Sequence, residues 1–185
     1  MQEVLFLCSN VLMKNQLRKE ALQKRKDFHV GKLSEEILKN LFSLDEYKFS
    51  KNILSYYPLK YEIQTQSCFL DCSKKWYLPR VNGDFLEICE YDPKKIKKGN
   101  FNIQEPTNEK ICDLNFLDMV IIPCVAADKN GYRIGYGKGY YDKFLPVLPV
   151  TCKKVLLVYS DLLYQTVYPD NYDDKVDILD TAKQI

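Results

Sequence analysis

Apolar positions along the chain follow two spacings, and the alternation between them predicts alternating helices and strands. The apolar residues of 33–44, "LSEEILKNLFSL", fall on one face of a helix, with Ser34 as the expected N-cap. Residues 14–28 are rich in good helix formers. The runs 117–128, "LDMVIIPCVAAD", and 153–160, "KKVLLVYS", are nearly continuous in apolar residues, as in strands buried on both faces of a parallel sheet.

Shorter segments complete this prediction. We expect a strand at 52–57 ended by Pro58, a helix near 65–72, a strand at 74–81 interrupted by Pro79 and followed by the segment "DFLEICEY" (84–91), and a helix starting at Tyr140. Helices that alternate with strands indicate an α/β protein, here a single three-layer α/β domain with a mainly parallel central sheet. Ligands of such sheets bind beyond the carboxyl ends of the strands.

A length of 185 residues is typical of one domain, which we place at residues 14–185. Residues 1–13 are apolar but have no positively charged start and no clear cleavage site. We interpret them as an extension, either disordered or part of a localisation signal. No apolar run approaches the roughly 18 residues that span a bilayer, so no membrane partner is expected.

Composition and charge narrow the classes of function. The formal net charge is only +2, so overall electrostatics do not require a nucleic-acid partner. The chain has seven cysteines and one histidine, and "CFLDC" (68–72) lacks the spacing of a redox or zinc site. We therefore expect reduced thiols and a cytoplasmic location.

The stretch "GYRIGYGKGYYDKFL" (131–145) contains four of the seven glycines. Glycine at positions 135, 137 and 139 allows positive φ and close approach of the backbone to a ligand. Inward-facing amides and the amino end of a following helix favour an anion, and Arg133 and Lys138 add full positive charge. The spacing matches neither a Walker A motif nor GxGxxG. Two interpretations follow: a phosphate-binding loop, or a surface turn whose glycines only permit tight packing.

A second basic feature lies in the amino-terminal helix. Lys14, Arg18 and Arg25 fall on one helical face together with the small residue Ala21. A bound polyanion would relieve the repulsion among these charges. The alternative is a solvated face of a lysine-rich helix.

Several segments occur in the order found in one enzyme family. They are "KNQLRKEALQKR", "YPLKYEIQT", "YLPRV", "NIQEP", "RIGYGKGYYDKFL" and "DDKVDILDT". From about Lys14 to Thr181 the chain resembles 5-formyltetrahydrofolate cyclo-ligases, also called 5,10-methenyltetrahydrofolate synthetases. The resemblance implies a three-layer α/β fold and ATP- and Mg²⁺-dependent cyclisation of 5-formyltetrahydrofolate to 5,10-methenyltetrahydrofolate, with release of ADP and phosphate. It further implies that ATP phosphorylates the formyl oxygen and that N10 then attacks the activated carbon.

The resemblance also implies roles for particular residues. ATP would contact Lys14, Asn15, Gln16, Leu17 and Arg18, and then Arg133, Ile134, Gly135, Tyr136, Gly137, Lys138, Gly139, Tyr140 and Tyr141. Folate would contact Tyr57, Glu62, Phe101 and the residues from Tyr136 to Tyr140. Asp142 and Asp173 would hold Mg²⁺, and Arg133, Lys138 and Tyr140 would be catalytic.

Other interpretations of these positions stay open. Tyr57 and Phe101 also suit core packing, Asp142 suits the first turn of a helix, and Asp173 suits a solvated loop. The lysine-rich run 94–98 either attracts the glutamate tail of a polyglutamylated folate or is simply solvated. Tyr172 stands where many relatives carry histidine, which leaves a proton-transfer role of that position in doubt.

Three functions therefore compete. The first is a monomeric cyclo-ligase, the second a folate- or nucleotide-binding protein without turnover, and the third an RNA-binding module. The intact Arg133, Lys138 and Asp142 favour the first over the second. The third lacks an RNP or GXXG signature.

Overall fold

The computed structural model describes residues 2–99, 102–108, 110–170 and 172–182. Its helices are α1 (Gln2–Lys24), α2 (Val30–Ser43), α3 (Asp45–Phe49) and α4 (Tyr140–Phe144). Short 3₁₀ helices are η1 (Arg25–Asp27), η2 (Gln66–Leu70), η4 (Leu114–Phe116), η5 (Leu145–Val147) and η6 (Ser160–Leu162). Phe101, expected to contact folate, lies outside the described residues.

The main sheet is mixed but mostly parallel. Its strands are β1 (Asn52–Leu54), β2 (Lys75–Asn82), β3 (Phe85–Glu90), β6 (Met119–Ile122), β9 (Lys153–Tyr159) and β11 (Ile178–Ala182). In the described residues they form a 6-stranded sheet of order β11-β9-β6-β1-β2-β3, parallel throughout except for the antiparallel β2–β3 pair. The predicted α/β class and mainly parallel sheet are confirmed.

This strand order has a switch point between β1 and β6. After β1 the chain adds β2 and β3 on one side, and it then returns to add β6, β9 and β11 on the other. Connections that leave in opposite directions open a crevice beyond the carboxyl ends of the two central strands. The crevice here lies after Leu54 and after Ile122.

Two smaller sheets lie beside the main one. The first joins β10 (Leu163–Tyr164), β7 (Ala126–Asp128) and β8 (Arg133–Ile134), with β7 and β8 antiparallel. The second is the antiparallel ribbon of β4 (Ile96–Lys98) and β5 (Gln104–Pro106). The turn between β7 and β8 contains Gly131 at φ +87°, and the glycine-rich loop begins directly after β8.

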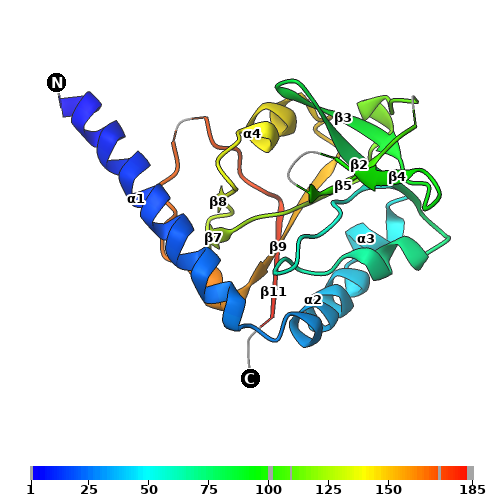
Figure 1. Ribbon diagram of the computed structural model, residues 1–185, viewed down its shortest axis with the longest axis horizontal. Helices are drawn as coiled ribbons and strands as arrows, with labels where there is room; N and C mark the ends of the chain where they lie inside the picture. The colour runs from blue at the N-terminus through cyan, green and yellow to red at the C-terminus, as the bar shows by residue number, and fades with distance from the viewer. Residues whose placement is uncertain (1, 100–101, 109, 171, 183–185) are drawn as a thin grey trace.

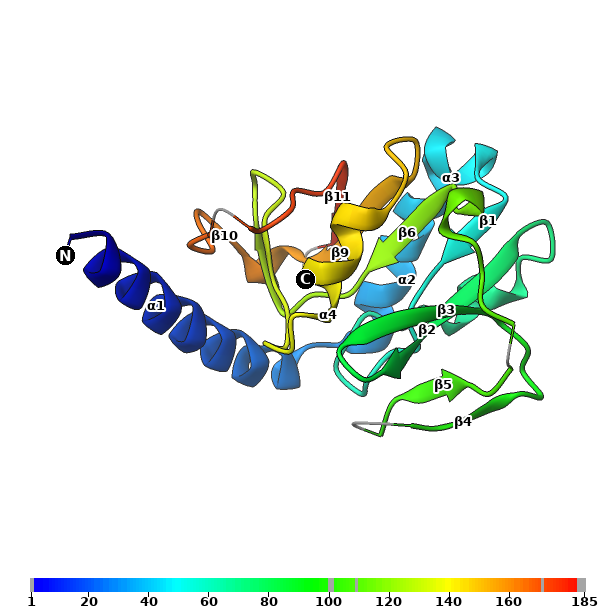
Figure 2. The same ribbon diagram turned by 90° about the horizontal axis from the view of Figure 1, so that it is seen from above.

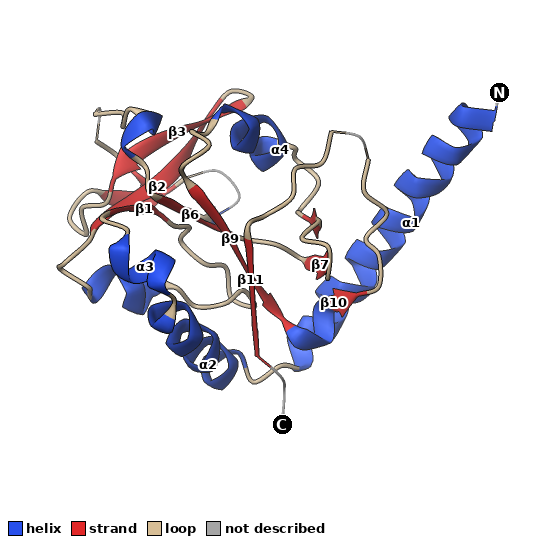
Figure 3. Ribbon diagram, turned by 180° about the vertical axis from the view of Figure 1, so that it is seen from behind, coloured by secondary structure: helices blue, strands red, loops and turns tan. Residues whose placement is uncertain are grey.

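Helices cover both faces of the main sheet. Figures 2 and 3 show α2 and α3 on one side and α4 on the other, which gives the predicted three layers. All four residues of β6 are buried, as expected of an internal strand. The apolar face of α2 is buried too, through Leu33, Ile37, Leu38 and Leu41.

The amino-terminal helix differs from the expected boundary. We expected a helix from Lys14 preceded by an extension, whereas α1 is one continuous helix from Gln2 to Lys24. Its first half projects from the body of the protein, and its second half passes beside β7 (Figure 1). The extension therefore continues the helix instead of forming a separate segment.

Two prolines act differently from the prediction. Pro79 does not interrupt its strand, because β1 pairs with β2 only through Lys75–Tyr77 and has ended before a backbone N–H is needed at position 79. Pro123, in contrast, divides the run 117–128 that we expected as one strand. The chain leaves the main sheet after Ile122 and enters the second sheet as β7.

Ser34 was wrongly predicted as the N-cap of α2. The helix begins at Val30, and the Ser34 hydroxyl donates to the Val30 carbonyl at 2.6 Å. The same hydroxyl accepts from the Gln64 N–H at 2.9 Å. Ser34 therefore fastens α2 to the segment after β1, which contains Glu62.

Within the described ranges, none of the helices combines the length and apolar character needed to cross a membrane.

Candidate active site

A cavity of about 580 Å³ opens at the switch point of the main sheet. Its walls come from the second half of α1, the segments that follow β1 and β6, the β2–β3 hairpin, β5, the glycine-rich loop, and the segment 170–173. Elements that are distant in sequence therefore meet at one place. This is the position predicted for a ligand of a parallel α/β sheet.

The glycine-rich loop (135–139) uses the backbone freedom of two of its glycines. Gly137 and Gly139 have φ of +86° and +71°, which side-chain-bearing residues rarely adopt. A Cβ added at Gly137 would also lie 3.5 Å from the guanidinium carbon of Arg18. Gly135 does not adopt positive φ, so the predicted alternation holds at two of the three positions.

Gly139 forms the N-cap of α4, which has only five residues. A helix of this length has a small macrodipole, so the partial charge expected from a following helix contributes little. Anion binding by the loop would depend on its amides and on side-chain charge.

Basic side chains of α1 face this loop. The Arg18 Nε donates to the Gly135 carbonyl at 2.8 Å, and its Nη1 donates to the Asn15 Oδ1. Lys14 lies about one turn earlier and lines the same cavity. Two of the three predicted basic residues thus flank the loop.

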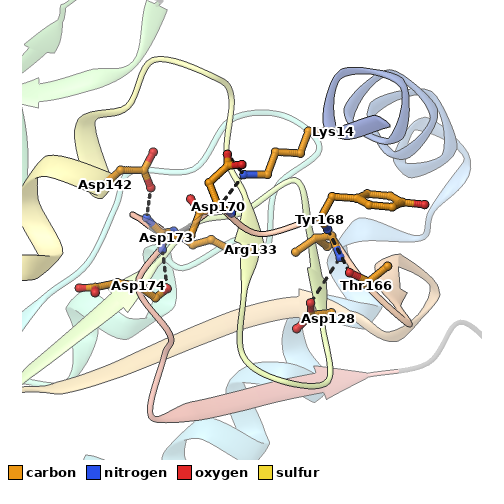
Figure 4. Close-up of polar contacts among 10 residues, drawn as sticks. Lys14, Asp128, Arg133, Asp142, Thr166, Tyr168, Asp170, Asp173 and Asp174 are labelled. Carbon is orange, nitrogen blue, oxygen red and sulfur yellow. Dashed lines mark hydrogen bonds and ion pairs between the residues drawn. The ribbon is translucent and has the colours of Figure 1, made fainter. Parts of the chain in front are cut away.

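Lys14 bridges two carboxylates of the carboxyl-terminal segment. Its Nζ lies 2.6 Å from both the Asp170 Oδ2 and the Asp173 Oδ2, and Figure 4 shows this contact between α1 and the segment. Burial lowers the pKa of Lys14, but hydrogen bonds to Asp170 and Asp173 outweigh that effect and the pKa is raised. Lys14 therefore remains charged at the cavity.

Arg133 lies beneath the loop. Its side chain is only 3% exposed, and its Nη2 donates to the half-exposed Asp142 carboxylate at 2.6 Å. Its Nη1 donates to the Asp174 carbonyl at 3.3 Å, so that Arg133 ties the loop to the segment 170–174 (Figure 4). In this arrangement the guanidinium holds Asp142, and its predicted catalytic role stays a prediction.

The acidic residues suit a cation that is shared with phosphate. Asp142 and Asp173 both line the cavity, and the buried Oδ1 of Asp170 has no hydrogen-bond partner among the described residues. Carboxylate oxygens are the ligands that Mg²⁺ prefers. In the described part of the chain no group of three or more His, Cys, Asp or Glu side chains could hold a metal by itself. Mg²⁺ bound to Asp142 and Asp173 would therefore need phosphate and water oxygens to complete its ligands.

Glu62 also lines the cavity and is buried, with 5% of its surface exposed. Its Oε2 accepts from the Leu59 N–H at 2.7 Å. Burial raises the pKa of Glu62, while hydrogen bonds from Leu59 and Tyr136 and the charge of Arg25 oppose the rise. A buried carboxylate in a cavity is suited to paired N–H donors of a ligand.

Three tyrosines complete the walls. Tyr57 lines the cavity and also stacks on Phe69, with ring centroids 6.4 Å apart, so the two open interpretations of Tyr57 are compatible. Tyr140 and Tyr141 follow the loop. The buried Tyr141 hydroxyl has no hydrogen-bond partner among the described residues. It is therefore able to bond to a ligand.

Most of the predicted site residues meet in this cavity. Those that line it are Lys14, Asn15, Arg18, Tyr57, Glu62, Arg133, Ile134, Gly135, Tyr136, Gly137, Lys138, Gly139, Tyr140, Tyr141, Asp142 and Asp173. Gln16 and Leu17 do not line it. Gln16 bonds to Glu20 on the exposed side of α1, and Leu17 packs against the core.

Some cavity residues were missed by the sequence analysis. Asp170 and the buried Glu105 both line the cavity. The nearness of Asp170 to Asp173 in sequence was a signal for Asp170, whereas Glu105 had no such signal. Arg25 was assigned to an exposed basic face, but it is buried at 3% exposure. That part of the prediction was wrong.

A charged, preformed cavity at the switch point of a parallel sheet defines an α/β enzyme that acts on small molecules. Residues 10–181 match the 5-formyltetrahydrofolate cyclo-ligase family. The chain belongs to this family, and the resemblance seen in its motifs is confirmed.

Individual relatives support the assignment. The 5-formyltetrahydrofolate cyclo-ligase of Mycoplasma genitalium is 31% identical over 170 residues, which cover 90% of this chain and 96% of the relative. The solved 5,10-methenyltetrahydrofolate synthetase of Aquifex aeolicus has a TM-score of 0.82 at 34% identity and covers 91% of this chain and 89% of its own. That of Mycoplasma pneumoniae has a TM-score of 0.73 at 27% identity, with 90% and 96% covered.

Proposed function

We propose that the protein converts 5-formyltetrahydrofolate to 5,10-methenyltetrahydrofolate. As the family resemblance implies, the reaction would consume ATP and require bound Mg²⁺. The observation that carries the proposal is the single cavity. It brings the cationic side chains of the loop and of α1 into the same space as the buried Glu62 carboxylate. Both substrates of a group transfer must meet in one enclosed space, and this space has an anion-binding end and a polar end for a heterocycle.

The anion-binding end would hold the triphosphate. Lys14 and Arg18 approach from α1, while Lys138 lies at the exposed tip of the loop between Gly137 and Gly139. Phosphoryl transfer mainly requires positioning and neutralisation of charge, without a covalent nucleophile. Backbone amides and these side chains supply both, and Mg²⁺ held by Asp142 and Asp173 would neutralise further phosphate charge.

The opposite end would hold the pterin of folate. The Glu62 carboxylate would accept hydrogen bonds from the exocyclic amino group and a ring N–H, and Tyr57 would contact the ring face. Tyr136 and Tyr140 also line the cavity, and the formyl group and the terminal phosphate would meet beside them.

The reaction proceeds in two balanced steps under this proposal. The formyl oxygen attacks the terminal phosphorus of ATP and ADP departs, which converts a poor leaving group into phosphate. N10 then attacks the activated carbon, the carbon–oxygen bond breaks, and phosphate leaves with the N10 proton. Lys138 stabilises the charge on the transferred group, and Arg133 keeps Asp142 in place at 2.6 Å.

We also propose a monomeric enzyme of the cytoplasm. The six cysteines whose surroundings are described are free thiols, as is usual in a reducing compartment. Turnover measured with monoglutamylated and with polyglutamylated 5-formyltetrahydrofolate tests whether the enzyme prefers a substrate with a polyglutamate tail.

The direct test is turnover. Purified protein with 5-formyltetrahydrofolate, ATP and Mg²⁺ should form the methenyl product, which is followed by its near-ultraviolet absorbance, together with one ADP per product. Omission of ATP or addition of a chelator should stop the reaction. Binding of both substrates without product would instead support the binding-protein alternative.

Replacement of Glu62 by glutamine tests the folate end. We expect Glu62→Gln to raise the KM for 5-formyltetrahydrofolate by roughly tenfold or more, because a hydrogen bond to a charged group contributes about 1.5–3 kcal/mol. The KM for ATP should change less, since the proposed triphosphate contacts come from Lys14, Arg18 and Lys138 and not from Glu62. Steady-state kinetics with each substrate varied in turn measure both values.

The matched control is Glu90→Gln, which makes the same chemical change on β3 at a side chain that is 41% exposed. Its KM values should equal those of the wild type. A Glu62→Gln enzyme with unchanged folate KM would remove Glu62 from the folate site.

A further inference from the structure

A buried arginine at the end of α1 bonds to the glycine-rich loop and to the segment after β6. Arg25, the first residue of η1, is 3% exposed although its guanidinium is charged. Its Nη2 donates to the Cys124 carbonyl and, at 3.2 Å, to the Val125 carbonyl. Its Nη1 donates to the Tyr136 hydroxyl at 3.0 Å. Arg25 therefore joins the end of α1 to the segment after β6 and to the glycine-rich loop.

The Tyr136 hydroxyl passes this interaction on to Glu62. It accepts from Arg25 at 3.0 Å, and its interaction with the Glu62 carboxylate raises the pKa of Tyr136. The hydrogen-bond partners of Arg25 are neutral oxygens, and its positive charge also lowers the pKa of Glu62. A buried charge without such partners would be costly.

The position of the Tyr136 ring depends mainly on the contacts of its hydroxyl group. Tyr136 is 41% exposed and lies between Gly135 and Gly137, which contribute no side chains for it to pack against. A Cβ at Gly135 would meet no atom within 4 Å, so no group packs against the Cβ side of the backbone there. The hydrogen bonds to Arg25 and Glu62 therefore hold the ring in the cavity.

We infer that Arg25 is a positioning residue for folate binding that acts through Tyr136 on Glu62. The inference rests on the proposed function, in which Glu62 binds the pterin. Because Tyr136 belongs to the glycine-rich loop, its hydroxyl also connects the protonation state of Glu62 to the loop that would hold ATP. Arg25 itself touches neither substrate.

Other ionisable groups around Glu62 do not replace this connection. Those that influence it, or are influenced by it, are Tyr56, Cys124, Tyr141 and Tyr159. Burial raises the pKa of each above its usual value, so these side chains stay neutral near neutral pH. Among the described groups that act on Glu62, Arg25 is the cation.

Tyr136→Phe tests the inference by removing one oxygen and keeping the ring. We expect the Kd for 5-formyltetrahydrofolate, measured calorimetrically without ATP, to rise by about tenfold. Glu62 also loses a donor that lowers its pKa, so the carboxylate is protonated at higher pH in the variant. The loss of folate affinity on acidification should therefore begin at higher pH than in the wild type.

A double-mutant cycle tests whether Arg25 acts through the hydroxyl. Arg25→Lys keeps a positive charge but loses the planar fork, and it should weaken folate binding by itself. Combined with Tyr136→Phe, it should add little further loss, because the hydrogen bond that Arg25 donates to the hydroxyl is already lost and lysine keeps the positive charge. Tyr132→Phe, in the turn between β7 and β8, is the matched control and should bind folate normally.

The outcomes separate the two proposals. Wild-type protein that binds 5-formyltetrahydrofolate but makes no product contradicts the proposed function and leaves the binding test of Arg25 in force. Two results overturn the inference. One is a double variant in which the losses of folate affinity of the single variants multiply. The other is a Tyr136→Phe protein whose folate affinity falls at the same acidic pH as that of the wild type. If Arg25→Lys does not fold, the affinity and pH profile of Tyr136→Phe decide it.

Discussion

Replacement of Lys138 by alanine should lower kcat by roughly a hundredfold or more, because a preorganised group that stabilises transition-state charge contributes about 3 kcal/mol. The free energy of unfolding should change by less than about 0.5 kcal/mol, as for an exposed residue. Lys138 is exposed at the tip of the loop, and its neighbours Gly137 and Gly139 keep their left-handed backbone in the variant. Single-turnover kinetics and chemical denaturation measure the two effects.

The control for Lys138 is Lys129→Ala, an exposed lysine in the turn between β7 and β8 and outside the cavity. It should retain full turnover. Parallel losses of stability and activity in Lys138→Ala would contradict a direct role in phosphoryl transfer.

Asp142→Asn should raise the Mg²⁺ concentration needed for half-maximal turnover by about tenfold, because one of two expected carboxylate ligands loses its charge. Asparagine has nearly the same shape and still accepts the hydrogen bond that Arg133 donates at 2.6 Å, so the loop should stay in place. Saturating Mg²⁺ should therefore restore much of the rate. A Mg²⁺ titration of turnover at fixed ATP gives the measurement.

Asp84→Asn makes the same change of charge at an exposed position after β2 and is the matched control. Its Mg²⁺ titration should superimpose on that of the wild type. If Asp142→Asn also superimposes, Asp142 is not a metal ligand.

The local sequence predicted those parts of the fold that depend on local patterns. The apolar face of 33–44 gave α2, and the run around Val120 gave a fully buried internal strand. The glycines at 137 and 139 predicted the positive φ that the loop adopts. Each of these features depends on neighbours within a few residues.

Features that depend on tertiary contacts were not predictable in this way. The helical face with Lys14, Arg18 and Arg25 was placed correctly toward one side of α1, but only Lys14 and Arg18 reach the cavity. Arg25 lies where α1 meets the segment after β6, and backbone carbonyls there replace a ligand as its partners. Helical spacing does not show what covers the last turn.

The strand division at Pro123 has a similar cause. Apolar content continues across the proline because both β6 and β7 are buried, so hydropathy does not mark the boundary. Asp170 was missed for a related reason. It meets Lys14 across 156 residues, and a contact at such a distance leaves no periodic signal in the sequence.

The bridge from Lys14 to Asp170 and Asp173 has a consequence for the biosynthesis of the enzyme. Since synthesis runs from the amino end, a growing polypeptide carries Lys14, Glu62 and the glycines of the loop well before the two aspartates emerge. Contacts spanning 156 and 159 residues close late and slow the search for the native state. Activity should therefore appear only when the final strand docks, and chains cut short before Asp170 should accumulate without it.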